Sequence, residues 1–120
     1  MTVDVDVWLR GQDHATTSAI TGIRSEPGSW TDDDVCDVLQ GMLAAMHRLK
    51  HPTEEPGPIA LRGLSWIVNP FEDGGVVIAI EITMGAAIAG PLAIDKTVLE
   101  TMIARVLAQS RPPSAVQTVH

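Results

Sequence analysis

Strict alternation of apolar and polar positions at the start of the chain limits the fold more than any other feature. Residues 3–10 read Val-Asp-Val-Asp-Val-Trp-Leu-Arg, with an aliphatic side chain at every odd position. Successive side chains of an extended strand point to opposite faces, so a period of two predicts a strand with one face in the core and the other in water. The chain must therefore build a sheet that is covered on one side.

A second strand and a long helix are predicted to follow. Residues 11–14 have turn chemistry and residues 15–23 are rich in β-branched side chains, which indicates a hairpin. Thr31 can cap a helix, and the aspartates that follow it suit the positive helix end. The helix is expected to run to about Lys50, because Pro52 ends it. Its apolar stripe consists of Val35, Val38, Leu39, Met42, Leu43, Met46 and Leu49.

The second half of the chain begins after a proline-rich linker over residues 51–58. Residues 59–68 and 76–84 are predicted to form a second hairpin around a polar turn. Residues 85–94 are apolar but rich in glycine and alanine, and we interpret them as a loop or a short bulged strand.

A last helix completes the pattern and suggests the fold class. Asp95 is expected to cap a helix that ends near Ser110, and residues 111–120 are expected to form a loose tail. Residues 1–110 would then be a single α+β domain built from two strand-strand-helix units. These units predict a four-stranded, mainly antiparallel sheet with both helices packed on one face.

The two units raise the question of an internal repeat with halves 1–51 and 58–110. A shift of 64 residues superposes Val35 on Leu99 and aligns the two helices. The alternative is that any two capped amphipathic helices align this well. The sequence leaves both interpretations open.

Charge and aromatic content exclude some classes of partner. Fifteen acidic against eight basic residues give a net charge of −7, and the chain has no Tyr, one Phe and three Trp. Such a surface repels phosphate backbones and anionic lipids, so we expect neither nucleic acid nor a membrane as a partner. The single cysteine, Cys36, excludes an internal disulfide, and the chain starts without a signal-like segment. Both observations predict a cytoplasmic protein.

Three groups of side chains could bind a metal or act in catalysis, but each also has an ordinary structural explanation. His47 and His51 have the spacing of two metal ligands on a helix, but histidine is also favoured near a helix C-terminus. Cys36 lies in a first helical turn, where the surrounding aspartates oppose a thiolate. Asp13 and His14 are common turn residues. We therefore expect no metal, no cofactor and no catalytic residue.

The second hairpin is apolar on both faces, which predicts an interaction surface. One face holds Leu64, Trp66 and Val68, and the other holds Ile59, Leu61 and Ile67. Two helices cover only one face of a sheet, so the other face needs a partner, and a two-fold homodimer is the simplest solution. The alternative is that residues 85–94 or the tail cover this face.

These features predict a non-catalytic protein-interaction module, such as an adaptor, a chaperone-like protein or an assembly protein, that acts as a homo-oligomer. The rival hypothesis is a small-molecule-binding protein or minor enzyme with a pocket between the sheet and the loop at 85–94. Glu81 interrupts an apolar strand and is expected to pair with Arg62 across the hairpin. The residues expected to bind are Trp66, Glu81, Met84, Ile88 and Arg62.

Overall fold

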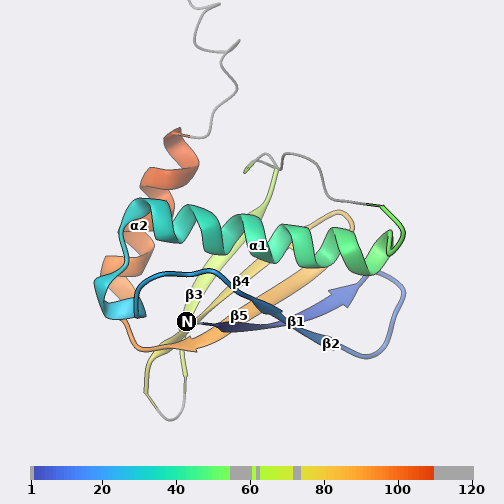
Figure 1. Ribbon diagram of the computed structural model, residues 1–120, viewed down its shortest axis with the longest axis horizontal. Helices are drawn as coiled ribbons and strands as arrows, with labels where there is room; N and C mark the ends of the chain where they lie inside the picture. The colour runs from blue at the N-terminus through green and yellow to red at the C-terminus, as the bar shows by residue number, and fades with distance from the viewer. Residues whose placement is uncertain (1, 55–60, 62, 72–73, 110–120) are drawn as a thin grey trace, which may run out of the picture.

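The computed structural model shows an α+β fold in which two α-helices lie beside one sheet (Figure 1). It describes residues 2–54, 61, 63–71 and 74–109. The elements are β1 (Val3–Leu9), β2 (Thr16–Ile20), a short 3-10 helix η1 (Pro27–Ser29), α1 (Asp32–Lys50), β3 (Ser65–Pro70), β4 (Val76–Ile82), β5 (Gly85–Leu92) and α2 (Lys96–Gln109).

The described residues form a five-stranded sheet in the order β2-β1-β5-β4-β3, with every neighbouring pair antiparallel. The expectation of four strands is therefore wrong in this detail, because residues 85–92 form the full strand β5; of the two alternatives for this segment, the structure shows a strand and not a loop. β5 is the central strand and pairs with β1 on one side and β4 on the other. Its Gly-Ala-Ala-Ile-Ala-Gly-Pro-Leu sequence has weak strand propensity, so its pairing on both edges decides its conformation.

The strand before the polar turn also differs from the sequence-based expectation. β3 begins at Ser65 and extends to Pro70, whereas residues 59–68 were expected to be extended. Residues 55–60 lie outside the described residues, and so does the predicted tail at 111–120. The second unit therefore has three strands before its helix, one more than the first unit.

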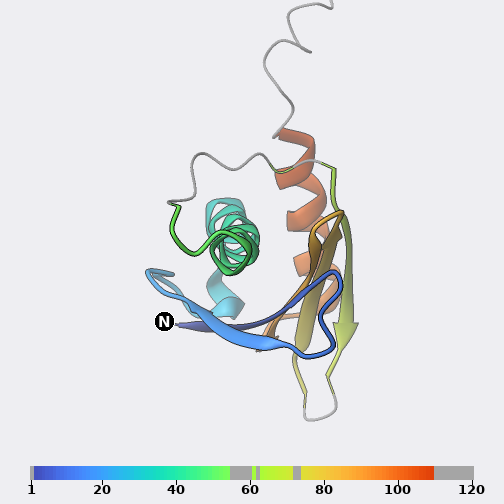
Figure 2. The same ribbon diagram turned by 90° about the vertical axis from the view of Figure 1, so that its right-hand side faces the viewer.

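Both helices pack on the same face of the sheet, as predicted. Figure 2 looks along α1 and shows the sheet curving around it, with α2 on the same inner side. Alternate side chains of the strands point into this layer, as the burial of Val3, Val5, Val7 and Leu9 in β1 shows. The largest side chains in the core include Leu39, Met42, Met46, Ile78, Ile80, Leu92, Leu99 and Ile103.

The start of α1 is fixed by the cap that the sequence predicts. Thr31 Oγ1 accepts a hydrogen bond from the Asp34 backbone N–H, and the Asp34 carboxylate accepts one from the Thr31 N–H, which makes a capping box. Trp30 is buried beside this cap and donates a hydrogen bond from Nε1 to the carbonyl oxygen of Ser25.

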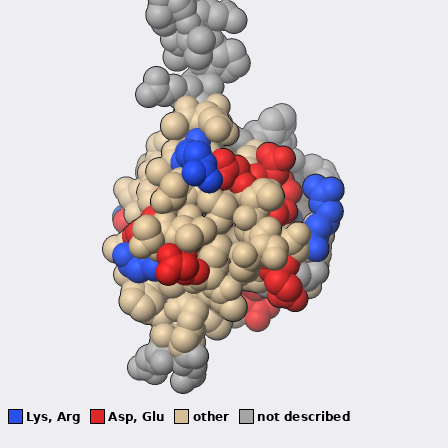
Figure 3. All heavy atoms as spheres, turned by 90° about the vertical axis from the view of Figure 1, so that its left-hand side faces the viewer, with Lys and Arg blue, Asp and Glu red and all other residues tan. Residues whose placement is uncertain are grey.

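Asp32 has a second role that the sequence did not reveal, because it joins α1 to α2. Arg105 Nε and Nη2 donate to the two carboxylate oxygens of Asp32 at 2.9 and 2.8 Å. These hydrogen bonds from Arg105 hold the pKa of Asp32 below its ordinary value. Figure 3 views the side on which α2 lies in Figure 1 and shows acidic and basic side chains adjoining on a mostly uncharged surface.

Replacing Gly85 with alanine should destabilise the fold. A methyl group at this position would meet the backbone carbonyl oxygen of Trp8 in β1, so the β1–β5 pairing would have to open. Overpacking of this kind costs about 1–3 kcal/mol, and a clash with backbone belongs at the upper end. Thermal unfolding should show a clear loss of stability in Gly85→Ala. The matched control is Gly28→Ala, where the added methyl group makes only an ordinary contact of 3.6 Å; equal melting temperatures for the two variants would contradict the packing described.

The ion pair between Arg105 and Asp32 should make the protein more stable at neutral pH than at acidic pH. A lowered carboxyl pKa in the folded state stabilises the protein above the unfolded-state pKa, and this contribution disappears as the pH falls through the folded-state pKa. Arg105→Gln should therefore melt below the unaltered protein at about pH 7, and the gap should narrow as the pH falls below about 4. A gap of the same size at neutral and at acidic pH would show that Arg105 stabilises the fold by some means other than the charge of Asp32.

Candidate functional site

The face of the sheet that points away from the helices carries the best candidate site. Strand register places Trp8, Ala86, Glu81 and Ser65 side by side across β1, β5, β4 and β3. The next row across the same strands contains Asp6, Ile88, Ala79 and Ile67. We call the surface formed by these two rows the open face, because no described element packs on it.

The open face contains a hollow of about 420 Å³. The middle of the hollow is recessed because Ala79 and Ala86, which are diagonal neighbours on β4 and β5, have small side chains between the larger ones of Ile88 and Glu81. Trp8, Ile67 and Ile88 form apolar walls, and Ile67 is 52% exposed. The hollow is lined by Trp8, Ser65, Trp66, Ile67, Ala79, Ile80, Glu81, Ala86, Ala87 and Ile88.

The charged residues within the strands of this face are all negative, and Arg10 follows β1 at its end, where its Nε donates to the carbonyl oxygen of Thr83 at 2.9 Å. The five strands contain no lysine or arginine, and their carboxylates are those of Asp4, Asp6 and Glu81. All three alternate with core residues along their strands, so they belong to the outer side of the sheet. Asp6 accepts a hydrogen bond of 2.7 Å from Thr17 Oγ1, whereas Glu81 is exposed at the edge of the hollow. An apolar ligand with a positive group would match this arrangement.

The structure brings together three of the five residues that the sequence predicted to bind. Glu81 and Ile88 line the hollow from the open face. Trp66 borders it from β3, although it pairs with Ile80 and its side chain packs against the core. Met84 lies in the turn between β4 and β5 and also packs against the core, away from the hollow. Arg62 lies outside the described residues, so its pairing with Glu81 stays a prediction.

Sequence reasoning missed the residues that give the hollow its shape. Trp8 was interpreted only as part of the wet face of the first strand, and Ala79 and Ala86 carried no signal of their own. The alternation along β1 already placed Trp8 opposite the core residues. What the sequence could not supply was the pairing of β5 with β1, which brings Trp8 next to Ala86.

The rival pocket does not have the form that the sequence suggested. Residues 85–92 belong to the sheet, so they cannot form a loop that covers it. The hollow instead has β5 in its floor, through Ala86 and Ile88.

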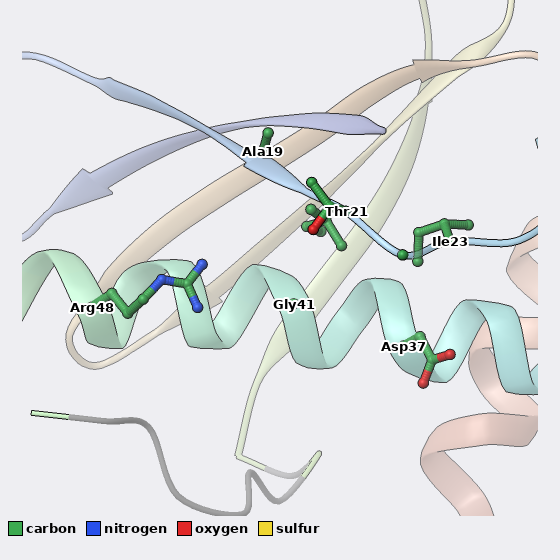
Figure 4. A pocket seen from close by; sticks show the side chains of 8 residues that line it. Ala19, Thr21, Ile23, Asp37, Gly41 and Arg48 are labelled. Atoms are coloured by element: carbon green, nitrogen blue, oxygen red, sulfur yellow. The ribbon is translucent and has the colours of Figure 1, made fainter. Parts of the chain in front are cut away.

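A second concave region follows the side of the sheet where β2 lies next to α1. Its larger part has a volume of about 280 Å³ and is lined by residues 19–23 and by Asp37, Gly41 and Arg48. Figure 4 shows Asp37 and Arg48 on α1 with Gly41 between them, and the segment from Ala19 to Ile23 running alongside the helix. A smaller part of about 210 Å³ continues along Thr16, Thr17 and Ser18 and shares Arg48.

The two histidines of α1 are close together without forming a metal site among the described residues. The ring centroids of His47 and His51 are 4.9 Å apart. His51 Nδ1 is 4.0 Å from a carboxylate oxygen of Glu54, and both side chains are partly exposed. The described residues contain no group of three or more histidine, cysteine or acidic side chains that could hold a metal ion.

The remaining candidates show no arrangement for catalysis. Burial raises the pKa of the Cys36 thiol, and the charges of Asp37 and Asp33 raise it further. A raised pKa leaves less thiolate, which is the reactive form. His14 Nδ1 is 3.3 Å from a carboxylate oxygen of Asp13, but both side chains are largely exposed on a turn. Neither Cys36 nor His14 is among the residues that line the hollow of the open face.

Comparisons with known proteins leave the site to be interpreted from its own geometry. No protein-family model, no curated protein and no solved structure matches the chain. Among the described residues, neither helix has the length and apolar character needed to cross a lipid bilayer.

Cys36 should react slowly with a chromogenic disulfide reagent in the folded protein. At about pH 8 an ordinary cysteine is partly thiolate, whereas the raised pKa of Cys36 keeps it mostly protonated. The reaction rate should rise as the pH increases beyond the usual range, and it should become normal in guanidinium chloride. A folded protein that reacts as fast as the unfolded chain at the same pH would contradict the environment described for Cys36.

Proposed function

We propose that the chain is a non-catalytic protein-interaction module that works as a homo-oligomer and binds a partner protein through the open face. The partner segment would carry an apolar anchor side chain next to lysine or arginine. The observation that supports this most directly is an apolar hollow of about 420 Å³ on a sheet face whose only charged strand residues are carboxylates.

The apolar part of the proposal rests on exposed surface that folding leaves in water. Ile67 is 52% exposed, and Trp8, Ala86 and Ile88 are each only partly buried. Burying apolar surface contributes about 25 cal/mol for each Å² removed from water. Ala79 and Ala86 leave room for one inserted side chain, and central anchors of this type dominate the affinity of protein interfaces.

The charged part of the proposal selects the kind of partner. Glu81 borders the hollow, and Asp6 lies beside Ile88 in the neighbouring strand pair. Two copies meeting through this face would bring their carboxylates together, which costs free energy, whereas a basic segment gains it. The open face is therefore better suited to a different protein than to the self-association expected from the sequence.

The same carboxylates argue against other classes of ligand. A nucleic acid phosphate or an anionic lipid would approach Asp4, Asp6 and Glu81 with no lysine or arginine in the strands to neutralise it. A cationic small molecule has the right charge, but the hollow is open and shallow and provides one carboxylate at its edge. A small-molecule role is therefore an alternative outcome of the test below.

Selection from a random peptide library on the immobilised protein tests the proposal. Enriched peptides should contain an aromatic or large aliphatic residue next to lysine or arginine. Ala86→Leu fills the hollow and should weaken their binding about tenfold, and Glu81→Gln should weaken it several-fold. Ala104→Leu is the matched control, because Ala104 is exposed on α2 away from the hollow, and it should leave binding unchanged.

Three results would contradict this proposal. The first is that no peptide is enriched, and the second is that enriched peptides bind Ala86→Leu as well as they bind the unaltered protein. The third is that only cationic small molecules, and no peptides, compete for the hollow, which would favour the rival function. Circular dichroism of each variant shows that a change in affinity does not come from unfolding.

A further inference from the structure

β2 is an unprotected edge of the sheet. Among the described residues no strand pairs with its outer side. Its sequence, Thr-Thr-Ser-Ala-Ile, contains no charge and no proline. Natural edge strands usually carry lysine, proline or a bulge that prevents pairing with another chain, and the opposite edge strand, β3, ends in Pro70. The outer side of β2 can therefore accept another strand.

The helix surface beside this edge is polarised. Asp37 and Arg48 both line the concave region between α1 and β2, at opposite ends of it (Figure 4). Arg48 lies near the beginning of β2, since it also contacts the hollow formed by residues 16–18. Asp33 lies one turn before Asp37, so one end of this surface carries two carboxylates and the other end carries Arg48.

We infer that a second copy of this chain binds at this edge, with the two β2 strands paired antiparallel about a two-fold axis. Such a pairing makes the two β2 strands run in opposite directions, so that the acidic end of one helix surface faces the basic end of the other. Arg48 of each copy would then face the partner's Asp37, so that two equivalent ion pairs form. The inference rests on the proposed homo-oligomer and names its contact surface, which is separate from the open face.

The position of α1 over β2 specifies the register of this pairing. Gly41 lies against Ile20, because a methyl group added at Gly41 would be 2.9 Å from the Ile20 side chain. The midpoint between Asp37 and Arg48 lies one and a half residues beyond Gly41, a distance of about 2 Å along the helix axis. α1 and β2 run in opposite directions, so this shift is toward Ala19 and is less than one strand residue of about 3.3 Å. The two-fold axis should therefore pass near Ala19.

The same axis brings small residues together at its centre. The helix positions related by it are Asp37 with the partner's Arg48, and Gly41 with the partner's Ala44. Gly41 and Ala44 are partly exposed and add little bulk between the helices. Like-charged ends of the two α1 helices are kept apart, because the acidic end of each helix faces the basic end of the other.

The spacing between the helices suits a long side chain. α1 packs on β1 and on its neighbours β2 and β5, so its axis lies over β1. Two β1 strands separated by a pair of β2 strands are three strand spacings apart, roughly 14 Å. A helix with its side chains is about 10–12 Å wide, so an extended arginine can cross the remaining gap to an aspartate.

Charge reversal tests this interface in the full chain. Light scattering or sedimentation at micromolar concentration should show a dimer of the unaltered protein. Arg48→Asp and Asp37→Arg should each raise the dissociation constant about tenfold, because each places like charges opposite one another. The double variant, Arg48→Asp with Asp37→Arg, restores both ion pairs in reversed order and should return the dissociation constant close to its original value.

A second variant tests the register without using α1. Ala19→Lys should also dissociate the dimer, because it places two lysines directly opposite each other across the axis. Ala19 is exposed, so this change should not affect folding. Ala104→Lys on α2 is the control and should leave the dimer intact.

The outcomes separate this inference from the proposed function. A monomer at all concentrations, single reversals without effect, or a double variant that stays dissociated would overturn the inference. If Ala86→Leu dissociates the dimer and Ala19→Lys does not, self-association takes place through the open face, and the inference is wrong. Peptide binding to the open face that persists in a dissociated Arg48→Asp variant would leave the proposed partner site intact.

Discussion

The pairing of β1 with β5 is the interaction on which the rest of the structure depends. It joins a strand from the first half of the chain to a strand from the second half, and no other strand pair does so. The backbones approach so closely at Gly85 and Trp8 that only glycine fits there. With this pairing in place, one continuous sheet has an inner face covered by α1 and α2 and an outer face that they do not cover.

The candidate site follows directly from that pairing. Trp8 comes from the first half of the chain, and Ala86, Glu81 and Ile88 come from the second. Neither half alone contains both the aromatic wall and the small-residue floor of the hollow. The acidic side chains have the same origin, since Asp6 on β1 lies opposite Ile88 on β5. The site is therefore a property of the assembled sheet.

Local sequence patterns predicted most of the helices and strands, because these elements are determined by residues that are close together in the chain. The alternation in residues 3–9, the Thr31 cap and the apolar stripe of α1 each act within a few residues, and the structure agrees with them. The sequence also indicated both helices on one face of a sheet. The sequence did not assign β5 firmly as a strand. Its conformation depends on pairing with a strand on each side, and its small residues have weak strand propensity. Glu81 was found because it interrupts an apolar strand, and Ile88 because it belongs to a segment expected to line a pocket beside the sheet, whereas the position of Trp8 beside them depends on long-range pairing.

Binding through the open face requires that the outer face of the sheet be accessible in solution. Methyl NMR with a soluble gadolinium chelate measures this access for individual side chains. We predict that the chelate broadens the methyl signals of Ile67 and Ile88, on the open face, and leaves those of Ile78 and Ile80, which are 0% and 2% exposed in the core, nearly unchanged. Equal protection of Ile88 and Ile78 in the monomer would show that the chain covers its own outer face, and this would contradict the account.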